Sequence, residues 1–109
     1  VRAMYYDKNK ISPKYFDDLF YNFNFQPIPF IDEEVLETKW DITEKLKKLK
    51  TSALIVYGRQ DDQGESTFYL QKESLLFSEL HVIEQCGHEI LEEQADDFFG
   101  VLRGYLDRR

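Results

Sequence analysis

Two short segments of the chain carry side chains suited to proton transfer. Residues 58–64 contain Asp61 and Asp62, and residues 85–89 contain His88. A carboxylate beside an imidazole fixes the tautomer of the ring and stabilises the ring once it is protonated, so the imidazole can act as a general base for a nucleophile. We therefore predict that Asp61 and His88 meet and share this chemistry, whereas Asp62 is expected to be a solvated neighbour.

Each of these residues also has a simpler explanation. Asp61 lies in a loop with glycine and glutamine, a composition typical of ordinary turns, and a single histidine is more often a surface or capping residue. The positions of Asp61 and His88 just after two predicted strands favour the catalytic interpretation. His81 falls inside a predicted strand and is expected to be structural.

The single cysteine of the chain, Cys86, lies close to His88. A thiol nucleophile is therefore an alternative, but a buried structural cysteine is the better prediction. A lone cysteine cannot form an internal disulfide, so nothing in the chain depends on an oxidising compartment.

The two segments need strands to position them. Residues 53–57 form a continuous apolar run ended by Gly58, which predicts a strand covered on both faces, and residues 80–83 predict a second strand. Helices are predicted over residues 66–77 and 98–106. Strand, helix, strand, helix is a βαβ arrangement with parallel strands, and active sites in such sheets lie at the carboxyl ends of the strands. The apolar positions of the helix predicted over residues 66–77 are Phe68, Leu75 and Leu76.

The first part of the chain differs in character. Residues 12–23 predict a helix that begins at a capping serine followed by proline. The prolines within residues 24–32 predict an extended or turning segment. Asp41 and Glu44 resemble a capping box, which predicts a short helix to about Lys50.

The second part resembles a known family. The run LIVYGRQDD is similar to the seventh strand and acid loop of α/β-hydrolases, and HVIEQCGHEILEEQADDFF is similar to their last strand, histidine loop and final helix. The ending GHEILEEQADDFFGVLRGYL is most similar to the proline iminopeptidase and haloalkane-dehalogenase-like branches. Gln94-Ala95 stands where a proline is common, which is a minor departure. The resemblance covers about residues 40–109.

The resemblance implies an α/β fold class. Residues 41–109 would be the C-terminal βαβα portion of a three-layer αβα hydrolase domain, with parallel strands and flanking helices. Residues 1–40 would be the helical and irregular remnant of a cap or lid, a region too variable to match by motif.

Carried over residue by residue, the resemblance assigns Asp61 as the acid and His88 as the histidine of a catalytic triad. The family order of nucleophile, acid and histidine agrees with their order here. No Gly-x-Ser-x-Gly nucleophile motif is present in the sequence, so the chain alone is predicted to be inactive. Its parent would be a peptidase or esterase that needs neither metal nor organic cofactor, with an aminopeptidase preferred to a carboxylesterase. A dehalogenase would need an aspartate nucleophile from elsewhere.

Net charge and the distribution of apolar residues limit the classes of partner that the chain can bind. The chain of 109 residues carries a formal charge of −7, which disfavours nucleic acid and anionic membranes. No apolar run approaches the roughly 18 residues of a membrane span, and no signal-peptide pattern opens the chain, so a cytoplasmic location is the default expectation. The basic cluster is expected to be the solvated face of a helix; it comprises Lys45, Lys47, Lys48 and Lys50.

Two parallel strands do not make a stable sheet by themselves, because sheets generally need a third strand or heavy helix cover. We expect the absent neighbour to come from a preceding N-terminal half, and the start at Val1 without a methionine favours a trimmed chain. The small-molecule or short-peptide substrate would bind the full-length protein. The alternative is a non-catalytic binding or assembly module that self-associates through the strand at residues 53–57.

Overall fold

The computed structural model describes residues 5–7, 9, 13, 14, 37 and 41–109. The helix predicted over residues 12–23 lies outside them except at residues 13 and 14, which are helical, and the segment 24–32 lies outside them entirely. The elements of the continuous part are α3 (Thr43–Leu46), β1 (Ala53–Gly58), α4 (Glu65–Ser74), β2 (Ser78–Ile83), α5 (Ile90–Glu93) and α6 (Ala95–Asp107).

The centre of the fold is a sheet of two parallel strands. β1 pairs with β2 in a register that runs from Ala53 opposite Ser78 to Gly58 opposite Ile83. The predicted strands and their parallel direction are thus confirmed. Because the strands are parallel and pair along their whole length without an offset, their carboxyl ends lie at the same edge of the sheet.

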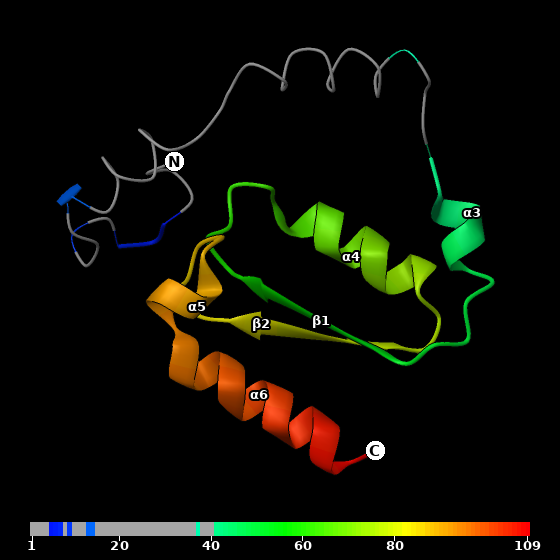
Figure 1. Cartoon of the computed structure of the whole chain (residues 1–109). Helices are drawn as coiled ribbons and strands as arrows, with labels where there is room; N and C mark the ends of the chain where they lie inside the picture. Colours follow the sequence, from blue (N-terminus) through cyan, green and yellow to red (C-terminus); the bar gives the residue numbers. More distant parts are fainter. Residues whose placement is uncertain (1–4, 8, 10–12, 15–36, 38–40) are drawn as a thin grey trace.

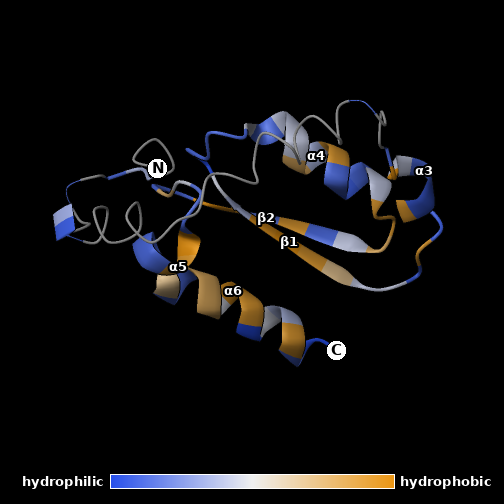
Figure 2. Cartoon of the chain, turned by 45° about the horizontal axis from the view of Figure 1, so that its top comes forward, coloured by the Kyte–Doolittle hydropathy of each residue, from blue (hydrophilic) through white to orange (hydrophobic). Residues whose placement is uncertain are grey.

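Helices cover the two faces of this sheet. α4 lies on one face and α6 on the other (Figure 1), and the apolar strands run between them (Figure 2). Tyr57 of β1 is fully buried and stacks on Phe68 of α4, with ring centroids 4.5 Å apart. From α6, the buried Tyr105 shares a hydrogen bond of 2.9 Å between its hydroxyl and that of Ser52. Cover on both faces explains why the first strand is apolar throughout instead of alternating.

The helix between the strands is shorter than predicted. α4 ends at Ser74, and Leu75 adopts an extended backbone that leads into β2. Of its apolar positions, Phe68 is buried, whereas Leu76 lies beyond the end of the helix and is 60% exposed. The apolar pattern continued past the point where the chain has to turn back toward β2.

The helix predicted to run to Lys50 also ends early, at Leu46. Asp41 accepts a hydrogen bond from the Thr43 N–H at 2.8 Å, while Glu44 pairs with Lys47 instead of closing a capping box. All four lysines of the basic cluster are exposed, as predicted. Within the described residues, no helix is long and apolar enough to cross a bilayer.

Gly58, at the end of β1, lies directly against the loop that follows β2. A Cβ atom at this position would overlap the carbonyl oxygens of Gly87 and Cys86. Both obstacles are backbone atoms, which cannot rotate away as a side chain can. The absence of a side chain at residue 58 therefore sets how closely the two loops approach.

We predict that Gly58→Ala lowers the free energy of unfolding by about 1–3 kcal/mol, because the added methyl group forces the loops apart. Urea unfolding followed by circular dichroism measures this. Gly100→Ala is the matched control, since a Cβ there meets no heavy atom within 4 Å, and alanine inside a helix should stabilise by about 0.5–1 kcal/mol. Equal unfolding midpoints for Gly58→Ala and the wild type would contradict the close approach.

Candidate active site

The loop after β1 holds the Asp61 carboxylate in one orientation. The Asp61 N–H donates to the Gly58 carbonyl at 3.0 Å, and the Gln63 N–H donates to Asp61 Oδ1 at 2.9 Å. Gly64 then takes a positive φ of 81°, which suits glycine and leads into α4. The Asp61 side chain is only 4% exposed, so little water competes for its remaining oxygen.

The loop after β2 brings a histidine to the same place. Gln85 has a positive φ of 52°, an uncommon conformation for a residue with a side chain. The Gln94 side-chain amide donates to the Gln85 carbonyl at 3.1 Å and supports this turn. The chain then passes through the buried Cys86 and Gly87 and reaches His88.

Asp61 and His88 form a direct hydrogen bond. His88 Nδ1 lies 2.9 Å from Asp61 Oδ2, and the imidazole side chain is 34% exposed. An ionised Asp61 can only accept, so in the neutral imidazole Nδ1 carries the proton and Nε2 keeps its lone pair. The neutral ring is thus held in the tautomer that a general base requires, and it stays partly exposed to solvent.

The surroundings of His88 favour its protonated form. The hydrogen bond to Asp61 is the main cause that raises the pKa of His88 above 6.5, and partial burial of the ring acts against it. The charges of Asp61, Glu89 and Asp62 raise the pKa further. An imidazole in this setting stabilises the positive charge that it acquires when it removes a proton.

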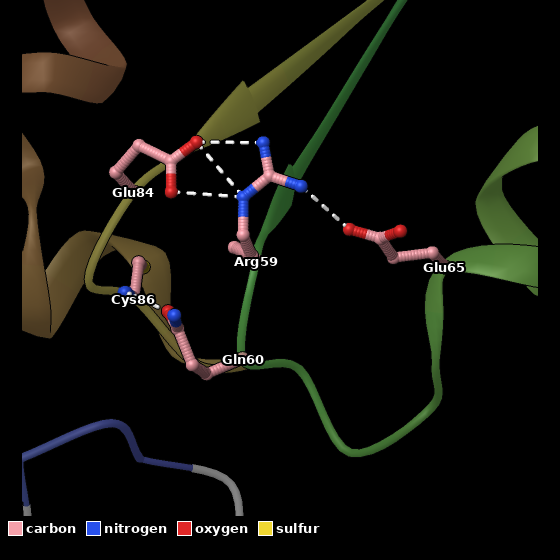
Figure 3. A network of polar contacts seen from close by, with 5 residues as sticks. All are labelled: Arg59, Gln60, Glu65, Glu84 and Cys86. Carbon is pink, nitrogen blue, oxygen red and sulfur yellow. Dashed lines mark hydrogen bonds and ion pairs between the residues drawn. The ribbon is translucent and has the colours of Figure 1, made fainter.

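Gln60 ties the two loops together beside this pair. The backbone N–H of Gln60 donates to the Cys86 carbonyl at 2.9 Å. The side-chain oxygen of Gln60 accepts from the backbone N–H of Cys86, also at 2.9 Å (Figure 3). The acid loop and the histidine loop are therefore joined one residue before Asp61 and two before His88. Gln60 was not predicted from the sequence, because its partner lies 26 positions away and no local pattern marks it.

Arg59 adds a second tie on the outside. The backbone N–H of Arg59 donates to the Ile83 carbonyl. Its guanidinium group donates to both carboxylate oxygens of Glu84 at 2.7 to 2.8 Å and to Glu65 at 2.8 Å (Figure 3). The hydrogen bonds from Arg59 lower the pKa of Glu84. These ion pairs are exposed, so they align the strand ends more than they stabilise them.

The other candidate residues take separate places. Asp62 is exposed, as predicted, and His81 is an exposed residue of β2. Cys86 is fully buried, which confirms its assignment as a buried cysteine. Burial is the main cause that raises the pKa of its thiol to about 11, so the thiol stays protonated and is a poor nucleophile.

Among the described residues, one group could hold a metal ion. Ligand atoms of Asp61, Asp62 and His88 all lie within 4.8 Å of one another. Asp61, however, already uses one oxygen on the Gln63 N–H and the other on His88. The geometry therefore suits a carboxylate–imidazole pair better, and the expectation that no metal is needed stays a prediction.

Comparison with known proteins adds an independent finding. Over 77 residues the chain is 30% identical to a 2-hydroxy-6-oxo-6-phenylhexa-2,4-dienoate hydrolase of Comamonas testosteroni, a match that covers 66% of the chain and 26% of that protein. Over 69 residues it is 32% identical to a proline iminopeptidase of Lactobacillus crispatus (strain ST1), covering 63% of the chain and 24% of that protein. No protein-family model matches the chain.

The chain thus spans about a quarter of the length of these curated relatives. Both relatives are hydrolases, and the similarity supports a relationship to proteins of the α/β-hydrolase fold. The parallel strands joined by helices agree with that relationship at the level of an α/β structure.

We predict that Asp61→Asn lowers the pKa of His88 toward 6.5, because the amide keeps the size of the carboxylate but loses its charge. Titration of the histidine ring protons by NMR measures this. Glu73→Gln, on an exposed position of α4, is the matched control and should leave the His88 curve unchanged. An unchanged His88 curve would show that the two side chains do not interact in solution.

The same pair predicts a pH-dependent stability. The pKa of His88 is higher in the folded chain than in the unfolded chain, where it is about 6.5. The Asp61–His88 pair therefore stabilises the folded chain fully at pH values below about 6.5. This contribution is lost as the pH rises through the folded pKa. The difference in unfolding free energy between wild type and Asp61→Asn should therefore shrink as the pH rises above about 6.5; a difference that grows would contradict it.

Proposed function

We propose that the chain is the C-terminal part of a serine-type α/β hydrolase and supplies the acid and the histidine of its catalytic triad. The observation that carries this proposal is the 2.9 Å hydrogen bond between Asp61 and His88, made from loops that follow two neighbouring parallel strands. The similarity to two hydrolases and the order of acid before histidine support it.

In this mechanism the nucleophile comes from a preceding part of the same protein. His88 Nε2 removes the proton of the serine hydroxyl as its oxygen attacks the substrate carbonyl carbon, and Asp61 stabilises the imidazolium that forms. His88 then gives the proton to the leaving group, and an acyl-enzyme remains. Water, deprotonated by His88, attacks the acyl carbon; the bond from that carbon to the serine oxygen breaks, His88 returns the proton to the serine, and the acid is released.

The proposal also defines the parts of the chain. Residues 41–109 would form the last portion of a three-layer hydrolase domain, and residues 1–40 the end of its cap. Among the described residues β1 pairs only with β2, so its other edge is open to a preceding strand of the parent. The N-terminal part of that parent is the partner we propose.

For the substrate we propose an N-terminal residue of a short peptide. The relative from Lactobacillus crispatus is a proline iminopeptidase, and the negative charges of Asp62 and Glu89 act on His88. Carboxylates near the reacting group suit a substrate with a free ammonium group. A neutral ester is the second choice, because it would gain nothing from these charges.

We predict that residues 41–109, grafted in place of the corresponding segment of the Lactobacillus crispatus enzyme, support hydrolysis of an amino-acid p-nitroanilide. His88→Ala in the graft should lower kcat by about 10⁴-fold. His81→Ala is the matched control and should have little effect. An active graft in which His88→Ala also has no effect would exclude the proposed role of His88.

The chain alone should hydrolyse neither p-nitrophenyl acetate nor an amino-acid p-nitroanilide above the rate of its own His88→Ala variant. Its sequence holds no nucleophile motif of the family. Turnover that depends on both Asp61 and His88 in material of 13.1 kDa would mean that a nucleophile is present after all.

A second candidate function is a non-catalytic assembly module. It is favoured by the edge of β1 that no strand of the described part of the chain covers, together with Phe99 and Leu106 of α6, which are 51% and 57% exposed. Exposed large apolar side chains and an unpaired strand edge are features of surfaces that associate. This function would use the fold without using the Asp61–His88 pair.

Sedimentation equilibrium tests this second function. An assembly module should be oligomeric at micromolar concentration, and Leu106→Glu should shift it toward monomer, because a charge cannot enter an apolar contact without a partner. Glu79 binds Arg108 at the surface, so Glu79→Gln is a control that alters charge without touching the apolar surface. A monodisperse wild-type monomer would contradict the assembly function.

A further inference from the structure

The side chain of Glu93, at the end of α5, holds three backbone N–H groups. Its Oε1 accepts from Tyr6 at 2.8 Å and from Gly87 at 3.0 Å, and its Oε2 accepts from Asp7 at 3.0 Å. Hydrogen bonds to an ionised carboxylate are shorter and stronger than those between neutral groups. One side chain therefore joins the peptide before His88 to a segment more than eighty positions earlier in the chain.

The segment that Glu93 holds is docked at a second point. Tyr5 is 4% exposed, and its hydroxyl donates to Glu92 Oε2 at 3.1 Å. Residues 5–7 thus contact two consecutive acidic residues of α5. A buried tyrosine and two anchored peptide groups make this a defined contact between residues 5–7 and α5.

The histidine loop is held from two sides. Gln60 bonds both backbone groups of Cys86 from the acid loop, and Glu93 bonds the N–H of Gly87 from α5. On the other side of the histidine, the Ile90 N–H donates to the His88 carbonyl at 3.1 Å. Among these three contacts, the one made by Glu93 also connects the loop to residues 5–7.

We infer that Glu93 is a positioning residue: its carboxylate fixes the peptide that precedes His88 and makes the placement of the imidazole depend on the docking of residues 5–7. The inference rests on the proposed role of His88. Both oxygens of Glu93 are occupied by backbone donors, so Glu93 is not a competing acid for the histidine. The charges that raise the pKa of His88 are those of Asp61, Glu89 and Asp62, so loss of Glu93 would act through geometry.

The test compares Glu93→Gln with the wild type in the full chain by NMR. Glutamine has one acceptor oxygen, and its NH₂ group would face N–H donors. Amide hydrogen exchange at Tyr6, Asp7 and Gly87 should accelerate by about tenfold or more. The pKa of His88 should fall toward the value seen in Asp61→Asn. Glu73→Gln, on an exposed position of α4, is the matched control and should change neither quantity.

Two results would overturn the inference. Unchanged exchange at the three amides would mean that the Glu93 contacts do not form. Faster exchange with an unchanged His88 titration would mean that Glu93 anchors residues 5–7 without positioning the histidine. In the second case the proposed function would stand, whereas an Asp61→Asn variant that leaves His88 unchanged would remove the proposed function itself.

If Glu93→Gln does not fold, Glu93→Asp gives the same decision. Aspartate keeps the charge but is one methylene shorter, so it cannot reach all three donors at once. We expect faster exchange at some of the three amides and a smaller fall in the pKa of His88. A wild-type pattern in Glu93→Asp at every amide and in the His88 titration would also overturn the inference.

Discussion

The candidate site depends on the close crossing of two loops at the end of a parallel sheet. Parallel pairing in step brings the carboxyl ends of β1 and β2 to one edge. The lack of a side chain at Gly58 lets the second loop lie directly against the first. Gln60 then joins the loops through its backbone N–H and its side-chain oxygen, which bond the carbonyl and the N–H of Cys86. The contact between Asp61 and His88 follows from these three conditions, because the backbone of the two loops already places the two side chains next to each other.

Much of this arrangement could be predicted from the sequence, because it follows from local patterns. A continuous apolar run predicts a strand covered on both faces, and the rule for strand ends selects the loops of Asp61 and His88 from the order of the predicted elements. The meeting of these side chains in the structure agrees with that selection. Their catalytic role stays a prediction, as does the division of the chain at residue 40.

The remaining features could not be predicted, because they depend on contacts between distant backbone groups. Gln60 and Glu93 recognise peptide N–H and carbonyl groups, which every residue carries, so no residue type on the other side marks the pairing. Likewise, the apolar pattern alone does not tell where α4 must stop; the path back to β2 decides that, and Leu76 becomes exposed. The similarity to two hydrolases supports the fold relationship without resolving these details.

The buried cysteine has a practical consequence. The Cys86 side chain is fully buried, and burial also keeps its sulfur in the unreactive thiol form. Both backbone groups of Cys86 bond Gln60, so the sulfur lies in the loop that this contact holds. The rate at which iodoacetamide alkylates the native chain therefore reports how often the structure around this loop opens. The chain carries its own probe for the kinetics of its candidate site, at the single position where a thiol occurs.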